Sequence, residues 1–70
     1  RQQAAVGAFT AALRLAPNDS SAWYGLALAY AAIGDIAASR NAESRLAELD
    51  DSLATQLHDE VARLVGSTQH

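Results

Sequence analysis

The chain has 70 residues, a formal charge of −3 and no cysteine. The absence of cysteine excludes a disulfide framework, and the negative charge argues against nucleic acid as the partner. A single core of this size is marginal without support from a metal or from neighbouring chain. No apolar run approaches the ~20 residues of a membrane span, so no membrane insertion is expected, and the initial Arg1 indicates part of a longer protein.

Helices are expected along the whole chain. Seventeen alanines and a single proline favour helix, because alanine is the best helix former and proline cannot continue one. The expected helices run over residues 2–15, 20–33, 36–49 and 52–65. Connections this short make consecutive helices antiparallel. The predicted fold class is therefore all-α, as either a closed bundle or an open stack of hairpins.

Proline, glycine and aspartate mark the ends of these helices. Pro17 ends the first helix, Gly34 suits the left-handed position after the second, and Gly66 ends the fourth. A side-chain oxygen can accept from the free amides of a first helical turn. The expected caps are Asp19 or Ser20 for the second helix, Asp35 for the third, and Asp51 or Ser52 for the fourth.

Apolar residues recur at helical spacing in each segment, which predicts one buried stripe per helix. Large residues are needed to fix the register among so many alanines. The expected structural core comprises Phe9, Trp23, Leu26, Tyr30, Leu46 and Leu57, and the stripes extend to Leu15, Ile33, Leu49 and Leu64. Aromatic residues at helical spacing are usually core. We therefore assign Trp23 and Tyr30 to packing rather than to ligand stacking.

The second segment carries a recognisable pattern. Its residues Trp23-x-x-Leu26-Ala27-x-x-Tyr30 resemble the first helix of the tetratricopeptide repeat, a helix-turn-helix unit of 34 residues. That family has a small residue at the position of Ala27, where the paired helix crosses at short range. The resemblance implies antiparallel helical hairpins stacked as a fragment of a right-handed superhelix, which favours the open stack.

The flanking segments fit the same phase. Phe9 and Pro17 stand where the second helix of a preceding repeat has its aromatic residue and its terminal proline, whereas Glu43 and Asp51 stand at these positions 34 residues later. In the family this aromatic packs towards the following repeat, so Glu43 indicates that no full repeat follows. The single domain, residues 1–70, is accordingly divided into a preceding second helix at 1–17, a full repeat at 18–51, a capping helix at 52–66 and a tail at 67–70.

The resemblance also implies a function. First helices of such a stack line a concave surface that holds a protein or peptide. The positions facing it here are Ser21, Tyr24, Leu28, Ala31 and Ala32. None is basic or an amide, so an apolar helix or strand is expected rather than a C-terminal carboxylate. The predicted function is a scaffold or adaptor module for protein–protein interaction.

Two less specific interpretations of the sequence remain as alternatives to a binding groove. Tyr24 and Leu28 are also the kind of partly exposed apolar residues that any protein surface carries. A second functional hypothesis is a structural or self-association element of a larger multidomain protein, such as one appended to an enzyme. A homodimer through the first helix, residues 2–15, is also expected, because its apolar stripe of Phe9, Ala12 and Leu13 lacks the preceding helix that would cover it.

The segment His58-Asp59-Glu60 is the one cluster with chemical character. Consecutive helical residues point in different directions, and the i+4 neighbour of His58 is Ala62, so the cluster cannot form a metal site. A solvated face is expected. The expected ion pairs are Asp59–Arg63, Arg40–Glu43 and Arg45–Glu48. Without a phosphate loop, an activated nucleophile or paired buried carboxylates, we expect no enzyme activity, no cofactor and no metal.

Overall fold

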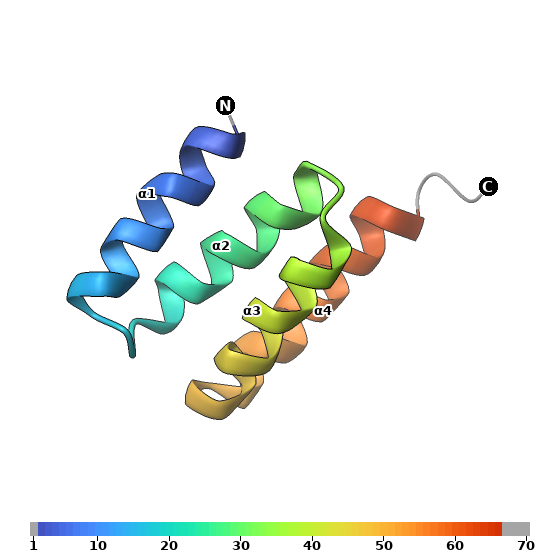
Figure 1. Ribbon diagram of the computed structural model, residues 1–70. Coiled ribbons are helices and arrows are strands. Elements are labelled where there is room, and N and C mark those ends of the chain that lie inside the picture. The colour runs from blue at the N-terminus through green and yellow to red at the C-terminus, as the bar shows by residue number, and fades with distance from the viewer. Residues whose placement is uncertain (1, 67–70) are drawn as a thin grey trace.

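The computed structural model describes residues 2–66 as four helices (Figure 1). They are α1 (Gln2–Leu15), α2 (Ser20–Ala32), α3 (Ile36–Leu49) and α4 (Asp51–Gly66). The all-α prediction is confirmed, and each helix end lies within one residue of its expected position. The expected tail, residues 67–70, lies outside the described residues. Within them, no helix combines the length and the apolar character that crossing a bilayer requires.

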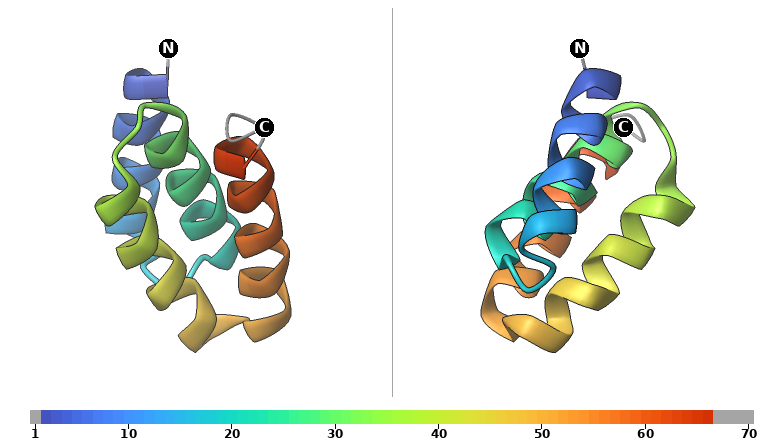
Figure 2. Two further views of the ribbon diagram at one scale, coloured as in Figure 1. Left: turned by 90° about the vertical axis from the view of Figure 1, so that its right-hand side faces the viewer. Right: turned by 60° about the vertical axis from the view of Figure 1, so that its left-hand side comes forward.

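The central element is α2, because it is the one described helix that packs against all three others. Figure 1 and the left view of Figure 2 show α2 between α1 and α4, and in Figure 1 α3 lies beside α2 and in front of α4. The helices α3 and α4 also pack together, but within residues 2–66 α1 contacts neither of them. The architecture is therefore an open stack of antiparallel hairpins and not a closed bundle.

The core cluster is built from leucine and alanine in equal parts. Its buried members are Leu13, Ala22, Leu26, Ala27, Ala42, Leu46, Ala54 and Leu57. Alanine lets backbones approach closely, and the leucines from α3 and α4 fill what remains, since Leu46 and Leu57 are fully buried. Ser39 of α3 is also buried, and its hydroxyl donates to the Ala27 carbonyl of α2 at 2.9 Å. This hydrogen bond satisfies the buried hydroxyl at the close crossing.

The crossing of α1 and α2 depends on a glycine. The ring of Phe9 lies directly over Gly25, so that a methyl group added at Gly25 would overlap three ring atoms. By contrast, nothing lies within 4 Å of a methyl group added at Gly7, on the exposed side of α1. A larger residue at Gly25 would therefore force the Phe9 ring to move, whereas Gly7 has no such neighbour.

Three aspartates cap the helices that follow a turn. Asp19 accepts from the Ala22 amide at 3.3 Å and Asp35 accepts from the Ala38 amide at 3.1 Å, as expected. The prediction for α4 was wrong, because its cap is Asp50 and not Asp51 or Ser52: the Asp50 carboxylate accepts from the Leu53 amide at 3.1 Å. Asp50 can do this because its extended backbone (φ −154°, ψ 96°) ends α3 and begins α4 at one residue.

The turn between α2 and α3 depends on the left-handed conformation of Gly34, whose φ is 88°. In this conformation the Gly34 amide donates to the Ala31 carbonyl at 3.1 Å, and the Asp35 amide donates to the Tyr30 carbonyl at 2.9 Å. These two bonds form a Schellman motif, which satisfies carbonyls that the end of a helix leaves free. The expected role of Gly34 is confirmed.

Four apolar residues that the spacing assigned to buried stripes are exposed. The exposed fractions are 90% for Leu15, 41% for Ile33, 41% for Leu49 and 50% for Leu64. Leu15 and Leu49 end their helices, Ile33 is the C-cap of α2, and Leu64 lies in the last turn of α4. Helical spacing predicts the direction of a side chain, but it does not show where the neighbouring helix stops covering it.

The two glycines provide a matched test of the α1–α2 crossing. Gly25→Ala should lower the free energy of unfolding by about 1–3 kcal/mol, because the Phe9 ring must move. Gly7→Ala should raise it by about 0.5–1 kcal/mol through helix propensity alone. Urea unfolding measures both. In a Phe9→Ala background the cost of Gly25→Ala should disappear, and equal stabilisation by both substitutions would contradict the crossing.

Candidate functional site

Two hollows lie on opposite sides of α2. The first, called the Leu28 hollow, has a volume of about 410 Å³ and is bordered by α1, α2 and α4; its lining residues are Ala5, Phe9, Gly25, Leu28, Ala29, Ala32, Glu60 and Leu64. The second, called the Trp23 hollow, has a volume of about 400 Å³ and is bordered by α2 and α3; its lining residues are Trp23, Leu26, Tyr30, Ala38, Asn41, Ala42 and Arg45. Both are shallow and open to solvent, and neither is an enclosed cavity.

The Leu28 hollow is apolar along its floor. Leu28 and Ala32 point into it from α2, one turn apart, and Phe9 forms its wall on α1. The opposite wall comes from α4, where Leu64 continues the apolar surface and Glu60 adds a charge. Glu60 pairs with Arg63 at 3.4 Å within the same helix. The hollow thus offers apolar contact with one acidic group at its edge.

The five expected groove residues divide into two sets. Leu28 and Ala32 line the Leu28 hollow. Ser21 is exposed on the same helix, whereas Tyr24 and Ala31 are half-buried, and Tyr24 packs against the core cluster. Sequence reasoning did not find Gly25, Ala29, Glu60 or Leu64, which complete the hollow. The i, i+4, i+7 spacing of Gly25, Ala29 and Ala32 was a usable signal, but the walls from α1 and α4 depend on tertiary packing.

The six expected core residues also differ in burial. Leu26, Leu46 and Leu57 have exposed fractions of 6%, 0% and 0%. Phe9, Trp23 and Tyr30 are half-buried and pack against the core cluster. Each of these three aromatic residues also lines one of the two hollows: Phe9 the Leu28 hollow, and Trp23 and Tyr30 the Trp23 hollow.

Trp23 makes contacts outside its own helix through its indole N–H and through the face of its ring. Its indole N–H donates to the Pro17 carbonyl at 2.8 Å, which ties the ring to the turn between α1 and α2. The Arg45 guanidinium of α3 lies over the ring, 5.7 Å from its centre, a distance at which a cation is attracted to an aromatic face. The pattern of Trp23 within its own helix predicted neither contact.

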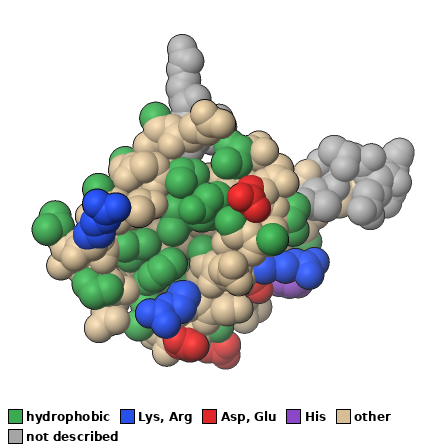
Figure 3. All heavy atoms as spheres, in the orientation of Figure 1, with side chains coloured by type: hydrophobic (Ala, Val, Ile, Leu, Met, Phe, Trp, Pro, Cys, Tyr) green, Lys and Arg blue, Asp and Glu red, His purple; other side chains and the backbone are tan. Residues whose placement is uncertain are grey.

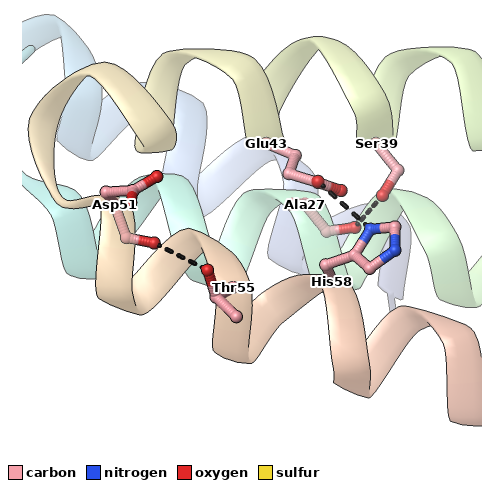
Figure 4. Close-up of polar contacts among 6 residues, drawn as sticks. All are labelled: Ala27, Ser39, Glu43, Asp51, Thr55 and His58. Atoms are coloured by element: carbon pink, nitrogen blue, oxygen red, sulfur yellow. Dashed lines mark hydrogen bonds and ion pairs between the residues drawn. The ribbon is translucent and has the colours of Figure 1, made fainter.

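A polar contact joins α3 to α4 (Figure 4). Nδ1 of His58 lies 3.3 Å from the Glu43 carboxylate, and this pair is ionic only when the imidazole is protonated. Both residues line a smaller hollow of about 210 Å³, together with Ile36, Ser39, Arg40, Val61 and Ala62. Two potential ligands do not make a metal site. Within residues 2–66, no three acidic or histidine side chains gather around one point that could hold a metal ion.

The expected ion pairs are only partly present. Arg45 and Glu48 pair at 3.8 Å, as expected. The Asp59–Arg63 prediction was wrong, because Arg63 pairs with Glu60 instead. The Arg40–Glu43 prediction was also wrong, because Glu43 faces His58 on the neighbouring helix. Glu43 thus contacts His58 on another helix, in place of the contact with Arg40 that helical spacing alone would allow.

A comparison with protein families supports the architecture described above. The family model of the tetratricopeptide repeat matches residues 8–41, which cover the second half of α1, all of α2 and the start of α3. Residues 8–41 therefore form a tetratricopeptide repeat, which confirms the resemblance seen in the sequence. No curated protein and no solved structure matches the chain. The repeat makes the chain, in general terms, a protein–protein interaction module.

Trp23 provides a test of how the turn and the hairpin are joined. Trp23→Phe keeps an apolar ring but removes the bond to Pro17, and should cost about 0.5–1.5 kcal/mol. Trp23→Ala should cost more, about 2–4 kcal/mol, because the ring is half-buried rather than fully enclosed. Leu15→Ala, at a position in solvent, should change stability by less than about 0.5 kcal/mol. Thermal melting distinguishes the three variants, because 1 kcal/mol shifts the melting temperature of a small domain by about 4–8 °C. Equal melting temperatures for all three would contradict the role of Trp23 in joining the turn to the hairpin.

Proposed function

We propose that the chain is a scaffold or adaptor module that holds an apolar helix or strand of a partner protein in the Leu28 hollow. The observation that supports this most directly is the hollow itself: Leu28 and Ala32 form an open apolar floor between walls from α1 and α4. Binding sites in proteins combine an apolar concave surface with a few polar groups. The membership of residues 8–41 in a family of protein-binding repeats supports the same function.

The lining residues favour one kind of ligand. None of them is lysine, arginine, asparagine or glutamine, so the hollow lacks the donors that a carboxylate requires. Burial of apolar side chains from the partner is the available source of affinity. Binding at this hollow should therefore depend little on salt, because salt screens charges and not apolar contact.

Peptide selection followed by mutation tests this proposal. Peptides selected from a random library on the wild-type chain should be apolar and should lose affinity for Leu28→Ala and Ala32→Glu. Ala11→Glu, at an exposed position of α1 away from the hollow, should leave their affinity unchanged. Raising the salt concentration should also have little effect. Circular dichroism confirms that each variant remains helical.

Two outcomes of that selection would count against the proposal. Peptides that bind Ala32→Glu and the wild-type chain equally would place binding elsewhere. Recovery of no apolar peptide, together with a mass that rises with concentration in light scattering, would favour the self-association hypothesis. In that case a second copy, joined through α1, covers the wall formed by Phe9.

A further inference from the structure

The Trp23 hollow is separate from the surface used in the proposed function. It lies on the side of α2 that faces the viewer in Figures 1 and 3, where hydrophobic side chains gather over α2 between α1 and α3. The hollow itself is lined by α2 and α3 alone. Because α1 contacts α2 but not α3 within the described residues, a strip of α2 lies between α1 and α3, and we call this strip, together with the hollow, the trough.

Polar groups with free hydrogen-bonding capacity stand around the hollow. The indole N–H of Trp23 is already bonded to Pro17, so that residue offers its ring. Tyr30 and Asn41 also line the hollow, and among the described residues neither side chain has a hydrogen-bond partner. Together with the Arg45 guanidinium they form a set rich in donors. Such a set suits a carboxylate.

Positive charge borders the trough on both walls. Arg45 stands on α3, and its pair with Glu48 is long at 3.8 Å, with both side chains more than half exposed. An exposed pair of this kind contributes little and is easily rearranged. On α1 the only described basic residue is Arg14, which forms no ion pair within residues 2–66. Arg14 is therefore unpaired within the described part of the chain, whereas Arg45 would have to exchange Glu48 for a ligand while it stays over the Trp23 ring. The chain as a whole is acidic.

Arg14 lies on the side of α1 that faces away from the Leu28 hollow. Leu13 is buried in the core, whereas Phe9 lines the Leu28 hollow. The row Thr10–Arg14 lies on the other side of Leu13 from Phe9, because each residue advances the helix by about 100°. Figure 3 agrees, since basic side chains are visible over α1 and over α3 at the edges of the hydrophobic patch.

We propose that the Trp23 hollow is a second docking surface, and that its occupant is an acidic amphipathic helix of a partner protein. Apolar side chains of that helix would fill the hollow over Trp23 and Tyr30, and its carboxylates would meet Arg45 on one wall and Arg14 on the other. A helix is the form that presents both features at once, with an apolar stripe between two charged edges. The two hollows thus differ in chemistry: binding at the Leu28 hollow depends on apolar contact, whereas binding at the Trp23 hollow also depends on charge.

Two synthetic peptides test this proposal. One is a helix of about 15 residues with leucines along a stripe and glutamates on both edges; the other has lysines in place of the glutamates. Neither contains tryptophan, so the emission of Trp23, the single tryptophan of the chain, reports binding at the hollow itself. The glutamate peptide should shift this emission saturably, and the lysine peptide should not. Added salt should weaken the glutamate peptide.

Matched substitutions on α3 locate the contact. Arg45→Gln should raise the Kd of the glutamate peptide by roughly twofold to fivefold, as expected for loss of an exposed ion pair. Arg40→Gln removes an exposed charge from the same helix, but about 140° around it, and should leave the Kd unchanged. Ala32→Glu, which blocks the Leu28 hollow, should also have no effect. This independence separates a failure here from a failure of the proposed function.

The proposal would be overturned by equal binding of the two peptides, by a Kd indifferent to Arg45→Gln, or by loss of binding in Ala32→Glu. Absence of any saturable change in emission at millimolar glutamate peptide would overturn it as well.

Discussion

The structure depends on the close approach of three helices to α2. A helix approached on three sides cannot carry large side chains all around, and α2 has small residues where the neighbours are nearest. Ala27 is fully buried, its carbonyl accepts from Ser39 of α3, and Gly25 makes room for the Phe9 ring of α1. Apolar residues therefore surround α2 instead of forming a single stripe, as expected for a helix covered on most sides. Larger residues at these positions would separate the hairpins.

The same constraint creates the two candidate binding surfaces. The helices α1, α3 and α4 cover α2 incompletely, so two strips of it remain open on opposite sides. One strip presents Leu28 and Ala32 in an apolar hollow, and the other presents Trp23 and Tyr30 beside Arg45. Both proposals therefore follow from an open stack, and a closed bundle would bury the two strips.

Sequence reasoning predicted the elements of this fold better than the contacts between them. Helix ends follow from local chemistry, such as the left-handed Gly34 and the caps Asp19 and Asp35, and these were predicted. Asp50 was missed because three candidate caps stand in succession, and only the extended backbone of Asp50 allows it to end one helix and begin the next. The tetratricopeptide pattern indicated that the paired helix crosses at Ala27, and Ser39 of α3 donates to the Ala27 carbonyl there. It did not indicate that Glu60 and Leu64 of α4 complete the Leu28 hollow, nor that Glu43 meets His58, because these contacts depend on how two helices are placed in space.

Native-state hydrogen exchange tests the central position of α2 most directly. In an open stack α1 can separate by losing its contacts with α2 alone, whereas α2 can exchange only when all three neighbours have opened. The account predicts that the buried amides of α2 exchange most slowly and that those of α1 exchange at least about tenfold faster, through local opening. If the amides of α1 and α2 exchange with one common free energy of opening, the four helices form a closed cooperative bundle and the account is wrong.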